Sequence, residues 1–552
     1  MNKKFIYTGL ALALSFGAMA QQDKNAMRFS APVNKDRAYS HLSILASDEY
    51  EGRETGKKGA WMAAEYIKKQ FQSFGLAGPV KNSKDPYFQK VGLVSYDLAS
   101  SGFSINGKTL QAYKDFNVSN NSVPVGSLNI SANEVVFAGY GISKEGFDEL
   151  NGLNLEDKVV MIFSAGDPTN PQAAADAQSN DRTAMRAAMM ARQKALGEIA
   201  KRKPKALLII DLNFDKTPLW MKEAGASGRL MLKNAATEAA IQKVPAYTSV
   251  TISKATADEI LKSSGTTIDA LVKKIAETVK PASQVVKANI TIKAEKKENE
   301  VRAENVLGFL EGSDPKLKNE VLVVTGHYDH IGLVRDPNAK DKVNNGADDD
   351  GSGTTGVLLL AEAFSKAKKA GNGPKRSILF MTVCGEEKGL LGSEWYSEHP
   401  VFAVENTIAN LNTDMIGRIG EEYLGKPDSA NYVYSIGSFK LSTDLGKLSE
   451  KVNDTYTKLK LDYKFDDPKD PQRIYYRSDH YNFAKLGIPI IFYYDGMLEQ
   501  DYHQPGDEVS KINFNLLAKR AQLIYYTAWE LANMPNRPVV DQKDETPPRG
   551  RN

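Results

Sequence analysis

The chain has 552 residues, of which 41% are apolar and 25% are charged. One domain usually takes roughly 100 to 200 residues, so this length predicts more than one domain and an ample core. A net charge of +3 is too small to indicate nucleic acid or a membrane surface as a partner, and we expect neither. The one cysteine, Cys384, excludes an intramolecular disulfide and stands in the apolar run SILFMTVC, which predicts a buried thiol.

Residues 1–20 have the pattern of a secretory signal peptide. Lys3 and Lys4 precede a short apolar run, and the small residues Ala18 and Ala20 form a cleavage pattern. The apolar run is shorter than the roughly 20 residues that a membrane-spanning helix needs, so cleavage after Ala20 is favoured over an anchor. We expect a secreted or periplasmic protein without a membrane span.

The predicted elements fall into three stretches. Residues 59–75 have apolar side chains at helical spacing and end on Gly75. From about 100 to 287, short β-type runs surround one Ala-, Met- and Arg-rich helix within 167–203, and no cluster of histidines or acidic residues occurs. This texture predicts a separate domain without chemistry of its own, and the Lys- and Glu-rich run 273–300 leads back from it.

From 301 to 533, apolar strand patterns alternate with helices, which indicates βαβ units and a mainly parallel sheet. We predict strands at 304–312, 320–326, 376–384, 407–415, 431–437 and 489–496. We predict helices at 351–367, 389–399, 444–456, 480–487 and 512–533. The proline-rich, charged segment 536–552 is predicted to be a disordered tail.

The stretch 321–353 joins a buried strand pattern to candidate metal ligands. His327 stands at the end of the strand, and Asp348, Asp349 and Asp350 precede a glycine-rich helix start. In open α/β sheets the ligand site lies beyond the carboxyl ends of the strands. Adjacent carboxylates repel one another unless a cation neutralises them, so this pattern favours a metal site. A solvated acidic loop is the alternative.

Four more polar groups follow predicted strands of the same region. They are Glu386-Glu387, Asp414, the run 477–480 (Arg-Ser-Asp-His) and Tyr502-His503. Because neighbouring strand ends converge in space, these groups can share one site. They offer imidazole and carboxylate ligands but no thiolate, which suits zinc, manganese or cobalt.

Six ordered motifs give the chain a resemblance to a known family. They are GHYDHIG, NGADDDGSGTTG, GEEKGLLGS, NTDMIG, SDHYNFAKLGIP and DYHQPGDE, between residues 326 and 508. In this order and spacing they resemble the co-catalytic zinc aminopeptidases of metallopeptidase family 28. The intervening runs FAGYGI, KVVMI and VPAYTSVTI resemble a protease-associated (PA) domain inserted into the peptidase domain.

The resemblance implies an α/β fold whose mixed, mainly parallel-centred sheet is flanked by helices, with an inserted β-rich PA domain. It implies that residues 21–112 and 291–535 form the peptidase domain and that residues 113–290 form the insertion. It also implies two zinc ions per chain, with other divalent ions possible. His327, Asp349 and Asp414 would bind one ion.

The second ion would be bound by His503, Glu387 and Asp349, so that Asp349 bridges the two ions. The resemblance further implies that Glu386 is the general base and that Tyr502 hydrogen-bonds the tetrahedral oxyanion.

Two more residues receive roles near the ligands. Asp329 would accept the second N–H of His327 and fix its tautomer. His480 would lie beside the ligands or the substrate, and a histidine of the core is the alternative.

Five remaining residues have structural expectations. We expect His330 to be structural or to cap a loop, His41 and His399 to lie on the surface, and Asp348 and Asp350 to shape the loop and cap the helix.

The implied function is hydrolysis of peptide bonds by a metal-activated water, with release of residues from free amino ends of peptides or proteins. Alternatives are a glutamate-type carboxypeptidase or dipeptidase of the same family, a glutaminyl cyclase, and a non-catalytic, receptor-like binding protein. The carboxypeptidase would need arginines for the substrate carboxylates, and Arg418 is one candidate.

Overall fold

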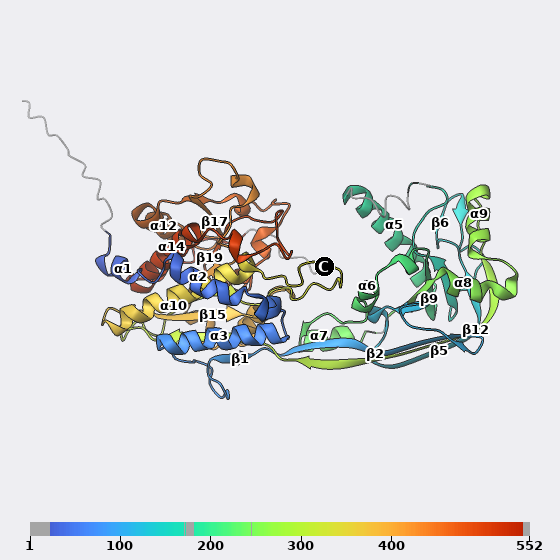
Figure 1. Cartoon of the computed structure of the whole chain (residues 1–552), viewed down its shortest axis with the longest axis horizontal. Helices are drawn as coiled ribbons and strands as arrows, with labels where there is room; N and C mark the ends of the chain where they lie inside the picture. The colour runs from blue at the N-terminus through green and yellow to red at the C-terminus, as the bar shows by residue number, and fades with distance from the viewer. Residues whose placement is uncertain (1–21, 171, 173–181, 244, 545–552) are drawn as a thin grey trace, which may run out of the picture. The chain divides into compact units, whose positions relative to one another are not determined.

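The structure is a computed structural model that describes residues 22–170, 172, 182–243 and 245–544 (Figure 1). The expected signal peptide at 1–20 and the end of the expected tail, 545–552, lie outside these residues. The chain divides into two compact units. The first comprises Met1–Lys90, Glu304–Val334 and Lys340–Asn552, and the second comprises Val91–Ala303 and Arg335–Ala339.

The first unit is built on one mixed sheet. Its strands are β1 (Phe88–Lys90), β13 (Glu304–Leu310), β14 (Val321–His327), β15 (Ser377–Val383), β16 (Thr407–Thr413), β17 (Tyr432–Ile436), β18 (Lys460–Asp462) and β19 (Ile490–Tyr494). Their order is β1-β13-β15-β14-β16-β19-β17-β18. The central strands β15, β14, β16 and β19 are parallel, whereas β1 pairs with β13, β13 with β15 and β17 with β19 in antiparallel fashion. The predicted parallel-centred α/β sheet is therefore confirmed.

Helices cover both faces of this sheet. They are α1 (Lys24–Phe29), α2 (Lys35–Leu45), α3 (Lys58–Phe74), α10 (Gly353–Lys369), α11 (Leu391–Glu398), α12 (Thr443–Val452), α13 (His480–Ala484) and α14 (Phe514–Asn533). The helices α2, α3, α10 and α14 pack together on one face, and α3 and α10 lie alongside the sheet in Figure 1. On the other face, Val323 of β14 shares an apolar cluster with Tyr396 of α11 and Phe483 of α13.

The six strands predicted for this unit are all present, as are the predicted helices. The prediction missed the short strands β1 and β18, and it missed α1 and α2 near the start of the chain. Asp23 and Asn34 each accept hydrogen bonds from backbone N–H groups at the start of these two helices. Such N-caps are the sequence signal that would have located them. None of the helices that the structure describes is both long and apolar enough to cross a membrane.

The second unit contains a second mixed sheet. Its strands are β2 (Leu93–Ile105), β3 (Lys108–Thr109), β4 (Phe116–Val118), β5 (Gly126–Phe137), β8 (Val159–Phe163), β9 (Ala206–Asp211), β10 (Met231–Leu232), β11 (Thr248–Ser253) and β12 (Gln284–Val301), beside a small hairpin of β6 (Ser143–Lys144) and β7 (Phe147–Asp148). Its helices are α5 (Arg182–Ala200), α6 (Leu219–Ala224), α7 (Ala235–Ile241), α8 (Lys254–Leu261) and α9 (Ile268–Thr278). Apolar side chains of α8 and α9 pack on one face and Ile199 of α5 packs on the other.

The bounds of this unit differ from the predicted 113–290. The difference arises from β2 and β12, which pair along most of their length, from Ile105 with Ile290 to Leu93 with Val301. Buried and exposed side chains alternate along much of β12, so its Lys- and Glu-rich sequence is the outer face of a strand rather than a connecting run. Because both strands belong to this sheet, the unit extends from 91 to 303.

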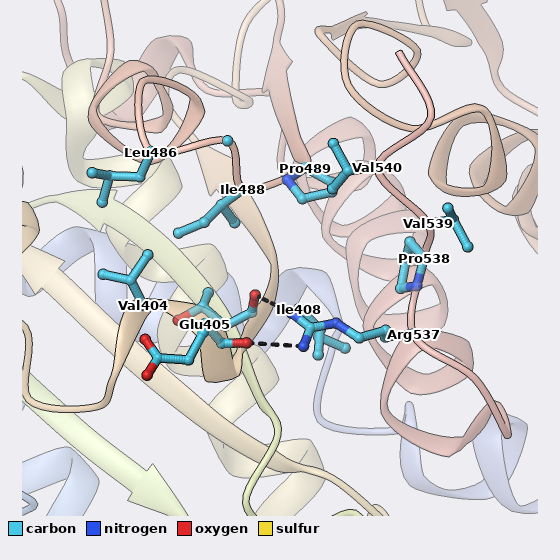
Figure 2. A pocket seen from close by; sticks show the side chains of 12 residues that line it. Val404, Glu405, Ile408, Leu486, Ile488, Pro489, Arg537, Pro538, Val539 and Val540 are labelled. Atoms are coloured by element: carbon cyan, nitrogen blue, oxygen red, sulfur yellow. Dashed lines mark hydrogen bonds between the residues drawn. The ribbon is translucent and has the colours of Figure 1, made fainter. Parts of the chain in front are cut away.

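The segment 535–544 lies against the first unit, although 536–552 was predicted to be a disordered tail. Arg537 donates hydrogen bonds to the backbone carbonyls of Glu405 and Thr407, both at 2.9 Å (Figure 2). The segment, the start of β16 and the turn before β19 enclose a largely apolar hollow of about 390 Å³. Backbone carbonyls of the first unit therefore bind residues 535–544 through Arg537. A prediction from composition and charge does not include such contacts.

Candidate metal centre

Four adjacent parallel strands direct the predicted site residues to one edge of the first sheet. His327 is the last residue of β14, and Asp414 directly follows β16. Glu386 and Glu387 follow β15 after one short turn, and His503 comes from the loop after β19. Because these strands are neighbours with the same direction, their carboxyl ends bring four distant parts of the sequence together.

A first group of potential ligands surrounds His327. Its Nε2 atom lies 3.3 Å from Oδ1 of Asp349 and 3.5 Å from Oδ1 of Asp414. The three side chains are buried, and one ligand atom of each lies within 4.8 Å of the others, as a shared metal ion requires.

A second group surrounds the other oxygen of Asp349. Nε2 of His503 lies 3.2 Å from Asp349 Oδ2 and 3.0 Å from Glu387 Oε2. His330 joins this group, because its Nδ1 lies 2.7 Å from Glu387 Oε1 and 3.8 Å from Asp349 Oδ2. Asp349 thus directs one oxygen to each group, which is the arrangement of a bridging carboxylate.

The donors fit divalent cations. His327 Nε2, His503 Nε2 and Asp349 Oδ2 are buried atoms without a hydrogen-bond partner in the described part of the chain. Buried polar atoms are normally satisfied, so these three atoms indicate a missing partner that accepts lone pairs from nitrogen and oxygen together. Imidazole and carboxylate donors of this kind suit zinc and related transition ions.

The electrostatics of the second group also favour a cation. Burial by itself would raise the pKa of Glu387, but the neighbouring His330 and His503 outweigh that effect and lower it to about 2. Burial would lower the pKa of His503, but Asp349 and Glu387 raise it to about 10. The carboxylates therefore hold positive charge here as protons on imidazole, which metal ions would displace.

Glu386 has a different environment from its neighbour Glu387. Its pKa is raised well above the ordinary value, chiefly by burial, against the attraction of His327 and with added repulsion from Glu387 and Asp414. Its carboxylate lies 3.9 Å from Nε2 of His327. A carboxylate with a raised pKa is a stronger base than an ordinary carboxylate, so beside a metal site it can accept and return a proton.

A cluster of acidic residues holds the Asp349 loop, and sequence reasoning missed one of them. Both carboxylate oxygens of Asp507 accept from backbone N–H groups, at 3.0 Å from Asp348 N and 3.0 Å from Asp349 N. Asp350 accepts from the backbone N–H groups of His327 and Gly353, so it ties the end of β14 to the start of α10 as expected. The DYHQPGDE motif contained Asp507, but only its position in space reveals what it binds.

The environment of Asp329 corrects its predicted contact. His327 Nδ1 lies 3.0 Å from the backbone carbonyl of Asp329 and 3.8 Å from its carboxylate. The carboxylate instead accepts from the hydroxyl of Thr55 at 2.6 Å and from the backbone N–H of Glu386 at 3.2 Å. The Asp329 carbonyl therefore fixes the tautomer of His327. The Asp329 carboxylate holds the backbone of Glu386, the expected general base.

His41 contradicts its expected surface position, and His330 and His480 are buried in surroundings that the expectations left open. His480 is buried, donates from Nε2 to the carbonyl of Tyr475 at 2.9 Å and stacks on Phe492, and no hydrogen bond or ion pair joins it to the ligand set among the described residues. His330 faces the second ligand group rather than capping a loop. His41 is buried, not exposed, because its Nδ1 pairs with the hydroxyl of Tyr66 at 2.8 Å.

Two expectations about single residues are confirmed. His399 is exposed, and Cys384 is buried beside Asn305. Arg418 does not line the cavity beside the ligand groups, and its Nη2 donates to Asp501 at 2.9 Å and to Gln500 at 3.2 Å.

A cavity opens beside the two ligand groups. It is lined by Asp349, Glu386, Asp414, Met415, Ile474, Arg477, Phe492, Tyr494, Leu498 and Tyr502. Tyr502 stacks on its neighbour His503, with ring centroids 3.9 Å apart, and receives a hydrogen bond from Arg477 at 2.9 Å. The cavity therefore joins potential metal ligands, a phenol and one guanidinium to an apolar wall.

The chain is similar to known proteins over part of its length. The chain is 31% identical over 246 residues to a probable leucine aminopeptidase of Arthroderma otae, covering 44% of this chain and 61% of that relative. It is 30% identical over 226 residues to a probable leucine aminopeptidase of Trichophyton verrucosum, covering 40% and 56%. The chain thus spans less than two thirds of the length of these curated relatives.

Solved structures cover more of the chain at lower identity. An aminopeptidase from Aneurinibacillus sp. strain AM-1 has a TM-score of 0.49 and 19% identity, covering 94% of this chain and 98% of that one. A zinc aminopeptidase from Bacillus subtilis has a TM-score of 0.48 and 18% identity, covering 93% and 99%. Residues 305–528, which hold all the proposed metal ligands, match the model of Peptidase family M28, in agreement with the resemblance of the six motifs.

Proposed function

We propose that this protein is a two-metal aminopeptidase that hydrolyses peptide bonds at free amino ends. The observation that carries the proposal is the position of Asp349, whose two oxygens lie 3.3 Å from His327 Nε2 and 3.2 Å from His503 Nε2. A carboxylate shared in this way gives each of two divalent ions a set of ligands. His327 and Asp414 would complete one set, and His503 and Glu387 would complete the other.

The proposed chemistry assigns a task to each cavity residue. Two bound divalent ions would supply an activated water and would polarise the scissile carbonyl. Glu386 would take the proton of the attacking water and return it to the leaving amine, for which its raised pKa is suited. The hydroxyl of Tyr502 would donate to the oxygen on which negative charge develops. His330, beside Glu387, would hold that ligand in place.

The lining of the cavity supports an apolar residue at the amino end of the substrate. Met415, Ile474, Phe492 and Leu498 form its wall, and burial of an apolar side chain against them is favourable. Two of the relatives are described as probable leucine aminopeptidases, which agrees with this lining.

We also propose that the second unit is a PA-type insertion and that the protein is exported. The insertion is supported by the pairing of Leu93 with Val301, since the chain leaves and returns to the first unit at neighbouring positions. Export is supported by the signal pattern of residues 1–20. Amino-terminal sequencing of the mature protein from periplasm and culture medium would test it, and an uncleaved Met1 would contradict it.

The function is tested by mass spectrometry of a peptide mixture in which half of the amino ends are free and half are acetylated. We expect the zinc-loaded protein to shorten only the free amino ends, residue by residue, and a chelator to stop the reaction. Loss of residues from the carboxyl end would indicate a carboxypeptidase, and ring closure of amino-terminal glutamine a cyclase. No change in any peptide would indicate a binding protein.

A further inference from the structure

Arg477 is the only basic residue among those that line the cavity. It stands in the segment before α13, partly buried, with its guanidinium 5.5 Å from the centre of the Tyr502 ring. Its Nη2 donates to the hydroxyl oxygen of Tyr502 at 2.9 Å. In the described part of the chain, no carboxylate and no backbone carbonyl binds the rest of its guanidinium.

The other buried arginines of this unit are bound by several acceptors. Arg53 donates to four backbone carbonyls, and Arg376 donates to Glu320 as well as to carbonyls. Arg520 donates to three carbonyls. A guanidinium has five N–H donors in a planar fork, so Arg477 keeps most of its donors available to whatever enters the cavity.

We propose that Arg477 binds the main-chain carboxylate of a short peptide, so that the site favours dipeptides over longer chains. The proposal rests on the proposed aminopeptidase function. A guanidinium in a partly dry cavity binds a carboxylate strongly and often through two parallel hydrogen bonds. No carboxylate of the described residues binds Arg477, so the substrate would supply the carboxylate.

The position of Arg477 fits the end of a dipeptide. Its Nη2 is one hydrogen bond away from Tyr502, whose hydroxyl would face the oxygen of the scissile carbonyl. Successive residues lie about 3.8 Å apart along a peptide, so the carboxylate of the second residue falls within a few ångströms of that carbonyl. Because Nη2 of Arg477 lies 2.9 Å from the Tyr502 hydroxyl, the guanidinium would also lie within a few ångströms of that carbonyl.

An acidic side chain at the amino end of the substrate is the other source of a carboxylate. The apolar wall made by Ile474, Phe492 and Leu498 disfavours it, because a carboxylate against these side chains would lose its hydration without a partner. The main-chain carboxylate of a dipeptide substrate lies on the other side of the scissile bond, so it would not contact these apolar side chains.

The test compares Leu-Gly with Leu-Gly amide, two substrates that differ only in the terminal carboxylate. For the zinc-loaded protein we expect kcat/KM to be at least about tenfold higher for the acid, the size expected for a charge-assisted pair. In R477M the ratio should fall to about one, and R477K should restore part of it. R473M is the matched control, since Arg473 is exposed in the same segment and lines no part of the cavity, and its ratio should stay unchanged.

Two further measurements separate the possible outcomes. Calorimetric titration of Glu386→Gln with both dipeptides reports binding without turnover, so it tests Arg477 even if the protein hydrolyses no peptide and the proposed function fails. The acid should bind about tenfold tighter, and Glu386→Gln/Arg477→Met should bind both equally. Equal affinities before Arg477 is changed would overturn the proposal. So would a preference for Glu-Gly amide over Gln-Gly amide that R477M abolishes, because the carboxylate would then be that of the side chain.

Discussion

His327 donates from Nδ1 to the backbone carbonyl of Asp329 at 3.0 Å, whereas the Asp329 carboxylate lies 3.8 Å away. The hydrogen bond fixes the tautomer in which Nε2 carries a lone pair toward Asp349 and Asp414. A backbone carbonyl is present whatever the side chain at position 329 is. The imidazole orientation is therefore insensitive to substitutions that leave the turn intact.

Asp329→Asn should consequently change zinc affinity less than about threefold, below the 10- to 100-fold loss typical when a residue that orients a metal ligand is removed. The asparagine oxygen can still accept from the N–H of Glu386, and its NH2 group can donate to the Thr55 hydroxyl in place of accepting from it, so the fold of the turn is kept. Competition with a chromophoric chelator measures the affinity, and Asp349→Asn should show the large loss. A tenfold loss in Asp329→Asn would restore the carboxylate as the orienting group.

Glu386→Ala should retain metal and lose about 10² to 10⁴ in kcat, the range for loss of a general base. The carboxylate is not placed as a ligand in either group, so metal content by elemental analysis should match that of the unsubstituted protein. A variant that keeps most of its activity would remove Glu386 from the mechanism. A variant that loses its metal would make it a ligand.

Asp507→Asn should weaken metal binding about 10- to 100-fold although Asp507 is no ligand. Its two oxygens hold the backbone N–H groups of Asp348 and Asp349, and an amide would present N–H groups to one of these donors. Chelator competition measures the effect, with Asp501→Asn as control because Asp501 pairs with Arg418 and Lys511 instead. Equal affinities of the two variants would show that the loop is held by other contacts.

Histidine burial should make the first unit sensitive to acid. Burial lowers the pKa of His480 to about 3, below its ordinary value of 6.5. The unfolded chain therefore binds a proton that the folded chain refuses, so stability falls as pH decreases from 6.5 toward 3. At pH 4 the free energy of unfolding is expected to be about 3 kcal/mol lower than at pH 7 because of this one histidine.

Glutamine at position 480 does not titrate, so in His480→Gln the unfolded chain no longer gains this proton at low pH. The glutamine amide keeps a donor for the Tyr475 carbonyl. The variant should lose less stability than the unsubstituted protein between pH 7 and pH 4, as measured by urea unfolding. His399→Gln is the control, because His399 is exposed, and its pH dependence should follow the unsubstituted protein. Parallel curves for all three proteins would mean that His480 is accessible to protons in the folded state.

The second unit should show the opposite pH dependence at one residue. Burial raises the pKa of Glu149 to about 7, although the backbone N–H groups of Tyr140 and Ile142 bind its carboxylate. The folded chain holds a proton here that the unfolded chain releases above about 4.5, so stability falls as pH rises through 7. The loss amounts to about 3 kcal/mol.

Glu149→Gln should abolish this part of the pH dependence, so that its thermal unfolding temperature relative to the unsubstituted protein rises between pH 5 and pH 8. Glu156→Gln, at an exposed position of the same unit, should not change that dependence. An unchanged slope in Glu149→Gln would show that the carboxylate is solvated or already ionised in the folded protein.

The local sequence determined the elements of the first unit and the types of its ligands. Val321–Val324 is apolar on both faces, which only a strand covered on both sides can satisfy, and the chain before α10 brings three carboxylates to its first turn. The elements that the prediction missed are short, or their many charged residues gave them the composition of a loop. In β12 buried and exposed side chains alternate over residues 286–294, so the Lys- and Glu-rich composition suggested a linker where the alternation indicates a strand.

Only the tertiary structure decided which atoms of the site residues are in contact. Spacing placed Asp329 two residues from His327, but the turn of the backbone gives the contact to its carbonyl. The same limit applies to His330 and His480, both buried, of which one faces Glu387 and the other an aromatic core. A sequence fixes residue types and their order along the chain. The contacts of a side chain depend on neighbours brought from other strands, which for Arg477 is Tyr502, 25 residues away.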